Sequence, residues 1–414
     1  MYPTNFRDVR ATPRVTQIRR AALAAGLLVP ALVLAACSSS SSSAGSGTTP
    51  SGGASASSSA GATGATGAGV DLAKKAVTQM EQPPTWQGPA DTVNVASAKG
   101  KTADLINLTE EIPALHEWAA VAQAQLEKLG VKANICDAKG TPEGITSCLT
   151  QDIAARPNVI VAMALDTSFI HGYIQQATAA GIKVITAQTG TPGVPQGTGA
   201  VAEVTFNYPE VGQMLGTWFA ASSGCQGYPQ IITSTSSRQP SAAEVTGIQA
   251  AVKQYCPSAS ALSVQNVLIP DWATNLPTVT RSLLNSNSAI DYMLPLYDGM
   301  TIYMVPAIEQ LHLSHQVQVG SFNATPVVMQ NELAKTSPLS ADVGGPNDWY
   351  GYALTDEILR VLAGAPVVAD EHVPLRLFTR DNLGSINLSA NESTWYGTVN
   401  FACQYDKLWG QACP

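Results

Sequence analysis

The sequence is poor in charge and has no second long apolar run after its first few dozen residues. Beyond the run Ala21 to Ala35, no stretch reaches the roughly 20 apolar residues that a membrane-spanning helix needs. The net charge is −8, and it becomes −12 once the first 36 residues, with five Arg and one Asp, are removed. Such an acidic balance argues against nucleic acid or anionic lipid as the main partner.

Motifs of catalysis and metal binding are also missing. His116-Glu117 begins like the helix of a zinc protease, but Ala120 stands where the second His is required. His312 and His315 lie close together without a nearby carboxylate or Cys to complete a metal site. No Gly-x-Ser-x-Gly turn follows a predicted strand. We therefore expect no catalytic residue, no metal site, no cofactor and no enzyme activity.

What the sequence does contain at its start is typical of a bacterial lipoprotein signal. Leu34-Ala35-Ala36-Cys37 closes the apolar run Ala21 to Ala35, which is preceded by a basic region with Arg14, Arg19 and Arg20. Cleavage before Cys37 would expose its thiol for lipidation, so we expect an anchor on the extracytoplasmic face of the cell membrane. The alternative is an ordinary cleaved signal with a chance cysteine, and Arg19-Arg20 also raises twin-arginine export.

A second pattern predicts how the rest of the chain is divided. Residues 1–36 would be the signal and 37–70, rich in Ser, Gly and Ala, a flexible tether. Residues 71–91, with three prolines and a tryptophan, are predicted to form an extended arm. We expect an N-terminal lobe of residues 92–202 plus 346–371 and a C-terminal lobe of residues 203–345 plus 372–414.

The six cysteines after Cys37 favour disulfides. They fall as three close couples, and in an exported chain an oxidising compartment is expected. Six cysteines allow fifteen connectivities, of which the short separations favour pairing of neighbours. No couple has the Cys-x-x-Cys spacing of a metal cluster. The expected pairs are Cys136 with Cys148, Cys225 with Cys256, and Cys403 with Cys413.

Short β-branched runs alternate with amphipathic stretches along the chain. Examples are the strand Val159–Ala164 followed by the helix Ser168–Ala180, and the alternation starts again after Asn207. Gly130 and Gly181 each stand between a helical pattern and a strand, where a left-handed C-cap is favoured. This βαβ rhythm predicts an α/β fold with two lobes built on parallel sheets. Two facing sheet edges would form a cleft that a hinge can close.

Four segments, in this order and spacing, carry a resemblance to a known family. They are Ala180 to Thr186 (AGIKVIT), Tyr297 to Met300 (YDGM), Val319 to Asn323 (VGSFN) and Val373 to Asn382 (VPLRLFTRDN). The chain resembles the sugar-type, ribose-binding-protein-like substrate-binding proteins of bacterial ABC transporters over roughly Thr92 to Leu383. This resemblance implies the type I periplasmic binding protein fold: two Rossmann-like lobes joined by three hinge crossings, here near Ala202, Gly345 and Glu371.

The resemblance also implies a set of ligand-binding residues in the cleft. Ala114-Leu115 stand where relatives often have stacking aromatics, while Met163 and Gln188 stand where they often have Asn and Asp. Glu244 occupies a position where relatives commonly use Arg, and the alternative is that it is a solvated helix residue. Trp272 could offer an aromatic face, with core packing as its alternative. The predicted set is Leu115, Met163, Gln188, Glu244, Trp272, Tyr297, Phe322 and Asn323.

These observations together predict an extracytoplasmic, lipid-anchored solute-binding protein. It would capture a small sugar or polyol between its lobes and hand it to an ABC permease, acting as a monomer. One alternative is a ligand-sensing receptor of the same fold that signals through a membrane kinase or chemoreceptor. Another is a secreted hydrolase, which would need a converging acid, base or nucleophile in the cleft.

Overall fold

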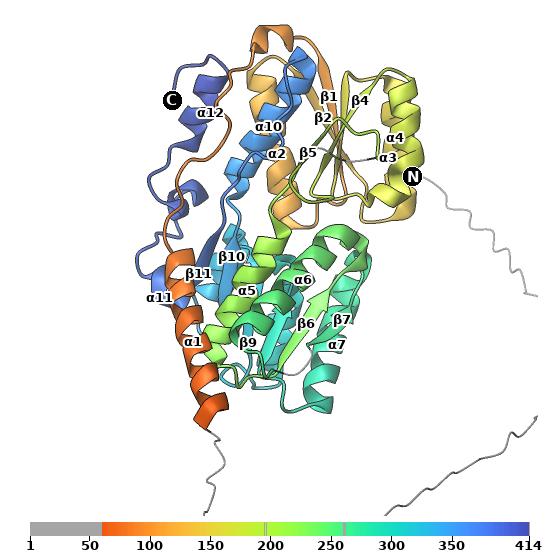
Figure 1. The fold of residues 1–414 in the computed structure, drawn as a ribbon. Helices are drawn as coiled ribbons and strands as arrows, with labels where there is room; N and C mark the ends of the chain where they lie inside the picture. The colour runs from red at the N-terminus through yellow and green to blue at the C-terminus, as the bar shows by residue number, and fades with distance from the viewer. Residues whose placement is uncertain (1–59, 194, 196, 260–261, 414) are drawn as a thin grey trace, which may run out of the picture. The chain divides into compact units, whose positions relative to one another are not determined.

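The structure, a computed structural model, describes residues 60–193, 195, 197–259 and 262–413 (Figure 1). The predicted signal peptide, Cys37 and residues 38–59 of the predicted tether lie outside these ranges. Two sheets organise the described residues, one of five strands and one of six. Each sheet is the centre of one lobe.

The sheet of the first lobe is wholly parallel and has the order β2-β1-β3-β4-β5. All five residues of β3 are buried, as expected for a strand covered by helices on both faces. In Figure 1, α3 and α4 lie on one side of this sheet and α2 and α10 on the other. The elements are β1 Thr102–Asn107, α2 Pro113–Lys128, β2 Lys132–Asp137, α3 Pro142–Ala155, β3 Val159–Met163, α4 Thr167–Ala179, β4 Lys183–Ala187, β5 Ala202–Val204 and α10 Asn347–Ala363.

The sheet of the second lobe has the order β11-β10-β9-β8-β6-β7. Its strands run parallel except β11, which pairs antiparallel with β10 at the edge. Helices α5 and α6 pack closely against each other here (Figure 1). The elements are α5 Tyr208–Ser223, β6 Pro229–Thr233, α6 Arg238–Tyr255, β7 Ser263–Asn266, α7 Trp272–Ser286, β8 Tyr292–Pro295, α8 Asp298–Gln310, β9 Gln318–Asn323, α9 Pro326–Val328, β10 Leu339–Gly344, β11 Arg376–Thr379 and α11 Arg380–Leu383.

From β1 to β11 the chain passes between the two lobes three times. It leaves the first sheet after β5, returns between β10 and α10, and leaves again between α10 and β11. Helix α10 packs on α2 of the first lobe although the strands on either side of it belong to the second sheet. The predicted α/β fold with two parallel-sheet lobes and a three-crossing hinge is therefore confirmed.

The β-branched run Thr92–Ala96 predicts the first strand, but the structure has no strand there. Residues Val95–Ser97 form a 3₁₀ turn, and the sheet instead begins with β1, Thr102–Asn107. The strand was missed because Asp104 interrupts its apolar run. In the fold this carboxylate is buried, and Oδ1 accepts a hydrogen bond of 2.7 Å from Nδ2 of Asn134 on the adjacent strand β2.

Two predicted segments are also corrected, because residues Ala60–Met80 form a long helix, α1, that takes in residues 60–70 of the predicted flexible tether and residues 71–80 of the predicted extended arm. Tertiary packing outweighs the low helix propensity of this Gly- and Thr-rich segment. A Cβ at Gly69 would lie 2.2 Å from the carbonyl oxygen of Tyr255, so only glycine allows α1 to approach the end of α6. Residues after the helix are not helical, and there the ring of Trp86 stacks on that of Trp349 with centroids 5.5 Å apart.

Three disulfides join the pairs that the short separations favoured. Cys136–Cys148 links β2 to α3, and Cys225–Cys256 links the loop after α5 to the end of α6. Cys403–Cys413 joins α12, Phe401–Leu408, to the residues that follow it. Each bond therefore links neighbouring elements of the chain and does not restrict movement of the lobes about the hinge.

Candidate ligand-binding site

A cavity lies where the carboxyl ends of the strands of both sheets meet. From the first lobe, Leu108 follows β1 and Gln188 follows β4, while from the second Tyr297 follows β8 and Asn323 ends β9. Ligands of open α/β sheets collect at this edge, so the cavity is the candidate site. Its other lining residues are Ile112, Ala114, Leu115, Trp118, Ala164, Tyr208, Ser237, Ile269 and Trp272.

The lobes are closed upon each other around this cavity. Its volume is about 40 Å³, which is room for roughly three water molecules. At one side, Oγ1 of Thr167 on α4 lies 3.4 Å from Oε1 of Gln239 on α6. A ligand larger than a few waters can therefore enter only when the lobes move apart.

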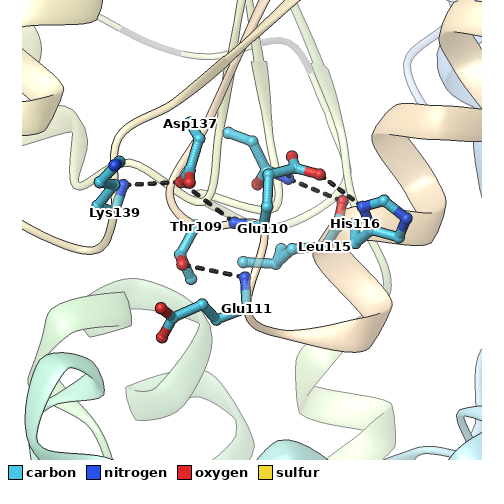
Figure 2. A network of polar contacts seen from close by, with 8 residues as sticks. Thr109, Glu110, Glu111, Leu115, His116, Asp137 and Lys139 are labelled. Carbon is cyan, nitrogen blue, oxygen red and sulfur yellow. Dashed lines mark hydrogen bonds and ion pairs between the residues drawn. The ribbon is translucent and has the colours of Figure 1, made fainter. Parts of the chain in front are cut away.

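A polar network shapes the loop between β1 and α2, which carries part of the lining (Figure 2). Oδ1 of Asp137 accepts a hydrogen bond of 3.2 Å from the backbone N–H of Glu110. The carboxylate of Glu110 in turn meets Nδ2 of Asn107 and Nδ1 of His116, both at 2.6 Å. Asn107 Nδ2 also donates to the carbonyl oxygen of Leu115 at 3.0 Å. These contacts hold the backbone that brings the Leu115 side chain to the cavity.

Aromatic side chains from both lobes form walls of the cavity. Trp118 comes from α2 and Trp272 from the first residue of α7. Their indole N–H groups are already used, because Trp118 donates to Oδ1 of Asn347 at 2.7 Å and Trp272 donates to the carbonyl oxygen of Val267 at 3.1 Å. What these two residues can offer a ligand is therefore their ring surface.

Gln188, which follows β4 of the first lobe, is a polar residue of the lining that is held by residues at the start of the second lobe. It is 1% exposed and has a left-handed φ of 57°, a conformation uncommon for a residue other than glycine. Its Oε1 accepts hydrogen bonds from the hydroxyl of Tyr208 and, at 3.3 Å, from that of Thr205. Within the part of the chain that the structure describes, its Nε2 has no hydrogen-bond partner. One buried donor thus remains for a ligand.

Tyr297 is neutral in this site. Its hydroxyl forms a hydrogen bond of 2.9 Å with Oγ of Ser241. Burial raises the pKa of Tyr297, and the nearby Glu244 acts in the same direction, while the hydroxyls of Ser241 and Ser237 oppose the rise. Because the phenol keeps its proton and no Asp, Glu, Lys, Arg or His lines the cavity, the site carries no charge.

Glu244 lies behind the cavity and is not part of its lining. It is fully buried on α6, and neither carboxylate oxygen has a hydrogen-bond partner. Burial, and then the charge of Asp342, raise the pKa of Glu244 well above its ordinary value. The expected alternative of a solvated helix residue is therefore wrong as well, since this carboxyl is a neutral group of the core.

Five of the eight predicted ligand-binding residues come together on the cavity wall and three do not. Those on the wall are Leu115, Gln188, Trp272, Tyr297 and Asn323. Besides Glu244, Met163 is fully buried at the end of β3 and Phe322 is fully buried in β9. The Phe322 ring packs edge-on against those of Phe206 and Tyr208. Met163 and Phe322 therefore support residues of the wall from behind.

Two aromatic residues of the lining were missed by sequence reasoning. Trp118 follows Leu115 by three positions on α2, so both lie on one face of the helix. Tyr208 begins α5 directly after the first hinge crossing. The signal for Trp118 was its helical spacing from Ala114-Leu115, whereas the sequence held no comparable signal for Tyr208.

The described residues contain no group of three or more His, Cys, Asp or Glu side chains that could hold a metal ion. None of the helices in the same ranges is both long and apolar enough to cross a membrane.

Comparisons with known proteins agree with the geometry. No curated protein matches the chain significantly. Among solved structures, a 5-methylthioribose transporter solute-binding protein from Thermotoga lettingae, in complex with 5-methylthioribose, superimposes with a TM-score of 0.63 at 17% identity, over 78% of this chain and 96% of its own. An ABC transporter solute-binding protein from Agrobacterium vitis with bound allitol gives 0.62 at 18%, over 70% and 98%.

A third solved structure, an ABC transporter solute-binding protein from Mycobacterium smegmatis with bound glycerol, has a TM-score of 0.61 at 19% identity, over 69% of this chain and 96% of its own. At these identities the likeness shows the fold. Family membership comes from the sequence itself, because the profile described as "Periplasmic binding protein domain" matches residues 105–366. The chain therefore belongs to the periplasmic binding protein domain family.

Proposed function

We propose that this protein is a lipid-anchored, extracytoplasmic solute-binding protein that captures a small carbohydrate-like ligand and delivers it to the permease of an ABC importer. The observation that carries the proposal is the uncharged cavity enclosed between two lobes at the carboxyl ends of their strands. A ligand in this position touches both lobes at once only when they are closed. It therefore stabilises the closed form, which a membrane partner can recognise.

Two features support a carbohydrate-like ligand. Trp118 and Trp272 present ring surface to the cavity, and aromatic faces pack on the apolar side of sugar rings. Structural relatives are named for, or contain, allitol, glycerol, 5-methylthioribose and galactofuranose, all small and rich in hydroxyl groups. The absence of charged lining residues disfavours amino acids, phosphates and other ions.

The anchor and the permease complete the proposal. Cys37 would carry the lipid, and the Ser-, Gly- and Ala-rich residues after it would let the lobes reach a partner in the membrane. We assign the lobes to residues 92–202 plus 346–371 and 203–345 plus 372–414, with the exception of α12, which packs on α10 of the first lobe. Motion about the three crossings would then open the cavity. Transport energy would come from a separate ATPase.

A thermal-shift screen tests the proposal directly. The full-length protein, purified in detergent, is heated with pentoses, hexoses, polyols, nucleosides and amino acids, because a ligand that binds only the folded state raises the melting temperature. A rise with a sugar, a polyol or one of their derivatives is expected. A rise with amino acids alone would discard the carbohydrate-like ligand.

A separate experiment tests the lipid anchor: Cys37→Ser should move the protein out of the detergent phase of Triton X-114.

A further inference from the structure

The hydrogen-bonding capacity of the cavity is small for a sugar site. Among its thirteen lining residues only Gln188, Ser237 and Asn323 carry a polar side chain that is not aromatic. A hexose has five hydroxyl groups, each a donor and an acceptor that loses its water on entering a closed cavity. A site that binds a hexose tightly must replace those partners, and this lining offers few of them.

The aromatic residues do not make up the deficit, because their polar atoms are occupied within the protein. The Tyr208 hydroxyl donates to Gln188, and the Tyr297 hydroxyl is paired with that of Ser241 at 2.9 Å. The N–H groups of Trp118 and Trp272 are used at 2.7 and 3.1 Å. The donors of Trp118, Trp272 and Tyr208 are therefore committed within the protein and the Tyr297 hydroxyl is already paired, so these four side chains meet a ligand mainly as ring surface.

One buried donor is left over. Gln188 lines the cavity and is 1% exposed, and its Oε1 is held by hydroxyl groups of Tyr208 and Thr205. The backbone N–H of Phe206, which can only donate, also approaches Oε1 at 3.5 Å, and this fixes which end of the amide is committed. Among the described residues, Nε2 has no hydrogen-bond partner. An unpaired buried donor is costly, so such a group in a binding cavity is most simply explained by an acceptor on the ligand.

We propose that the ligand is an uncharged, sugar-like molecule in which an apolar group replaces at least one hydroxyl, and that one of its oxygens accepts a hydrogen bond from Nε2 of Gln188. The apolar group would be a methyl, a deoxy carbon or an alkylthio substituent, packed against the rings of Trp118 and Trp272. This inference rests on the proposed function and narrows its ligand class.

Matched pairs of ligands test the first half of the proposal. Isothermal titration of the full-length protein would compare 5-methylthioribose with ribose, L-rhamnose with L-mannose, and D-fucose with D-galactose, so that the members of each pair have the same configuration. In at least one of the three pairs, the first member is expected to bind about 10 to 100 times more tightly than the second. This is the scale on which a site discriminates a hydroxyl group for which it has no partner. Allitol and glycerol serve as polyol references.

The outcomes distinguish a failure of the apolar-group inference from a failure of the proposed function. If the fully hydroxylated members bind as well as or better than their partners, the apolar-group inference is overturned while the proposed function stands. If none of these compounds binds and an amino acid or another charged solute does, the carbohydrate-like ligand and the inference both fall. Failure of every solute in the screen would also count against both.

A pair of variants tests Gln188. Replacing Gln188 alone would strand the Tyr208 hydroxyl, so the double variant Gln188→Met/Tyr208→Phe removes both partners together, a change that can leave stability nearly unaltered. Its reference is Tyr208→Phe, which keeps the amide. With whichever ligand the matched pairs identify, the double variant should bind at least about 10 times more weakly than the single one. Equal affinities of the two variants, at similar melting temperatures, would overturn the role of Nε2. Gln175→Met, an exposed position on α4, is the control for a Gln-to-Met change.

Discussion

Nε of Arg238 lies 3.4 Å from Oδ2 of Asp166, and this ion pair joins the first residue of α6 in one lobe to the N-cap of α4 in the other. Next to it, Thr167 and Gln239 also approach each other across the cleft. Both contacts exist only while the lobes are closed. The pair therefore acts on the equilibrium between open and closed forms.

Arg238→Gln should shift this equilibrium toward the open form. The Arg238 side chain is 69% exposed, so the pair contributes only about 0.2–1 kcal/mol, which is a change of about 1.4- to 5-fold in the ratio of the two forms. Opening would expose Trp118 and Trp272, both 3% exposed in the closed form. Acrylamide should accordingly quench tryptophan fluorescence more strongly, and the difference from wild type should shrink at high salt.

The control for this variant is Lys253→Gln, which removes a positive charge at the other end of α6. It should leave the quenching unchanged. If both variants raise quenching equally, overall charge and not the contact with Asp166 is responsible.

Glu244 should make the protein less stable as the pH rises. Burial raises the pKa of Glu244 well above its ordinary value of 4.5 in the folded state. A carboxyl whose pKa is raised by folding contributes its full stability below pH 4.5, and loses about 1.4 kcal/mol per pH unit between that pH and its folded pKa. Glu244→Gln should therefore reduce the fall in the free energy of unfolding between pH 5 and pH 8.

Urea unfolding at a series of pH values measures this effect. Glu127→Gln, at an exposed position of α2, serves as the matched control and should keep the wild-type pH profile. Because Glu244 lies outside the cavity lining, Glu244→Gln should also change ligand affinity by less than about twofold, a scale well below that of a lost ligand hydrogen bond. A large loss of affinity at unchanged stability would return this carboxyl to the binding site.

Helices α5 and α6 are predicted to tolerate no side chain where their glycines meet. A Cβ at Gly212 would lie 1.9 Å from the carbonyl oxygen of Glu244, and one at Gly247 would lie 2.2 Å from that of Pro209. Gly212→Ala should lower the free energy of unfolding by about 2–3 kcal/mol, because separating the helices outweighs the gain of about 1 kcal/mol in helix propensity.

Gly172→Ala is expected to stabilise the protein, in contrast to Gly212→Ala. Gly172 lies inside α4, and a Cβ there would have no atom within 4 Å. Only the propensity term remains, so this variant should stabilise the protein by about 0.5–1 kcal/mol. If urea unfolding gave the two alanine variants the same midpoint, the close approach of α5 and α6 would be wrong.

Local signals predicted the fold better than they predicted the site. Gly130 and Gly181 were expected as left-handed residues at the ends of helices, and both have a φ of 82°. Buried runs such as Val159–Met163 were recognisable because a strand covered on both faces is apolar throughout. By contrast, α1 depends on a contact between Gly69 and Tyr255, which are far apart in the sequence. No local sequence pattern predicts this helix.

Which residues line the site depends on the exact position and rotation of each strand end and helix, and these are harder to predict from the sequence. That residues after strands would line the cleft was predictable, and Gln188, Tyr297 and Asn323 do so. Glu244 was assigned to the cleft from the resemblance to the family, but it lies on a helix, where a small rotation decides between cavity and core. The polar partners of the wall also come from other segments, as with Asn347 for Trp118, so the apolar character of the cavity could not be inferred from the chain alone.

The disulfides offer a last prediction, on their relative contributions to stability. Cys225–Cys256 closes a separation of 31 residues and Cys403–Cys413 one of 10. In the loop-entropy account, the longer loop stabilises the fold by roughly 3.7 kcal/mol and the shorter by roughly 2.7 kcal/mol. The first bond also ties α5 to α6, the helices that carry Tyr208 and follow Ser237, whereas the second lies at an exposed end of the chain. Urea unfolding should show that Cys225→Ala/Cys256→Ala costs more than Cys403→Ala/Cys413→Ala, and the reverse order would mean that the C-terminal residues contribute more to the fold than their exposure indicates.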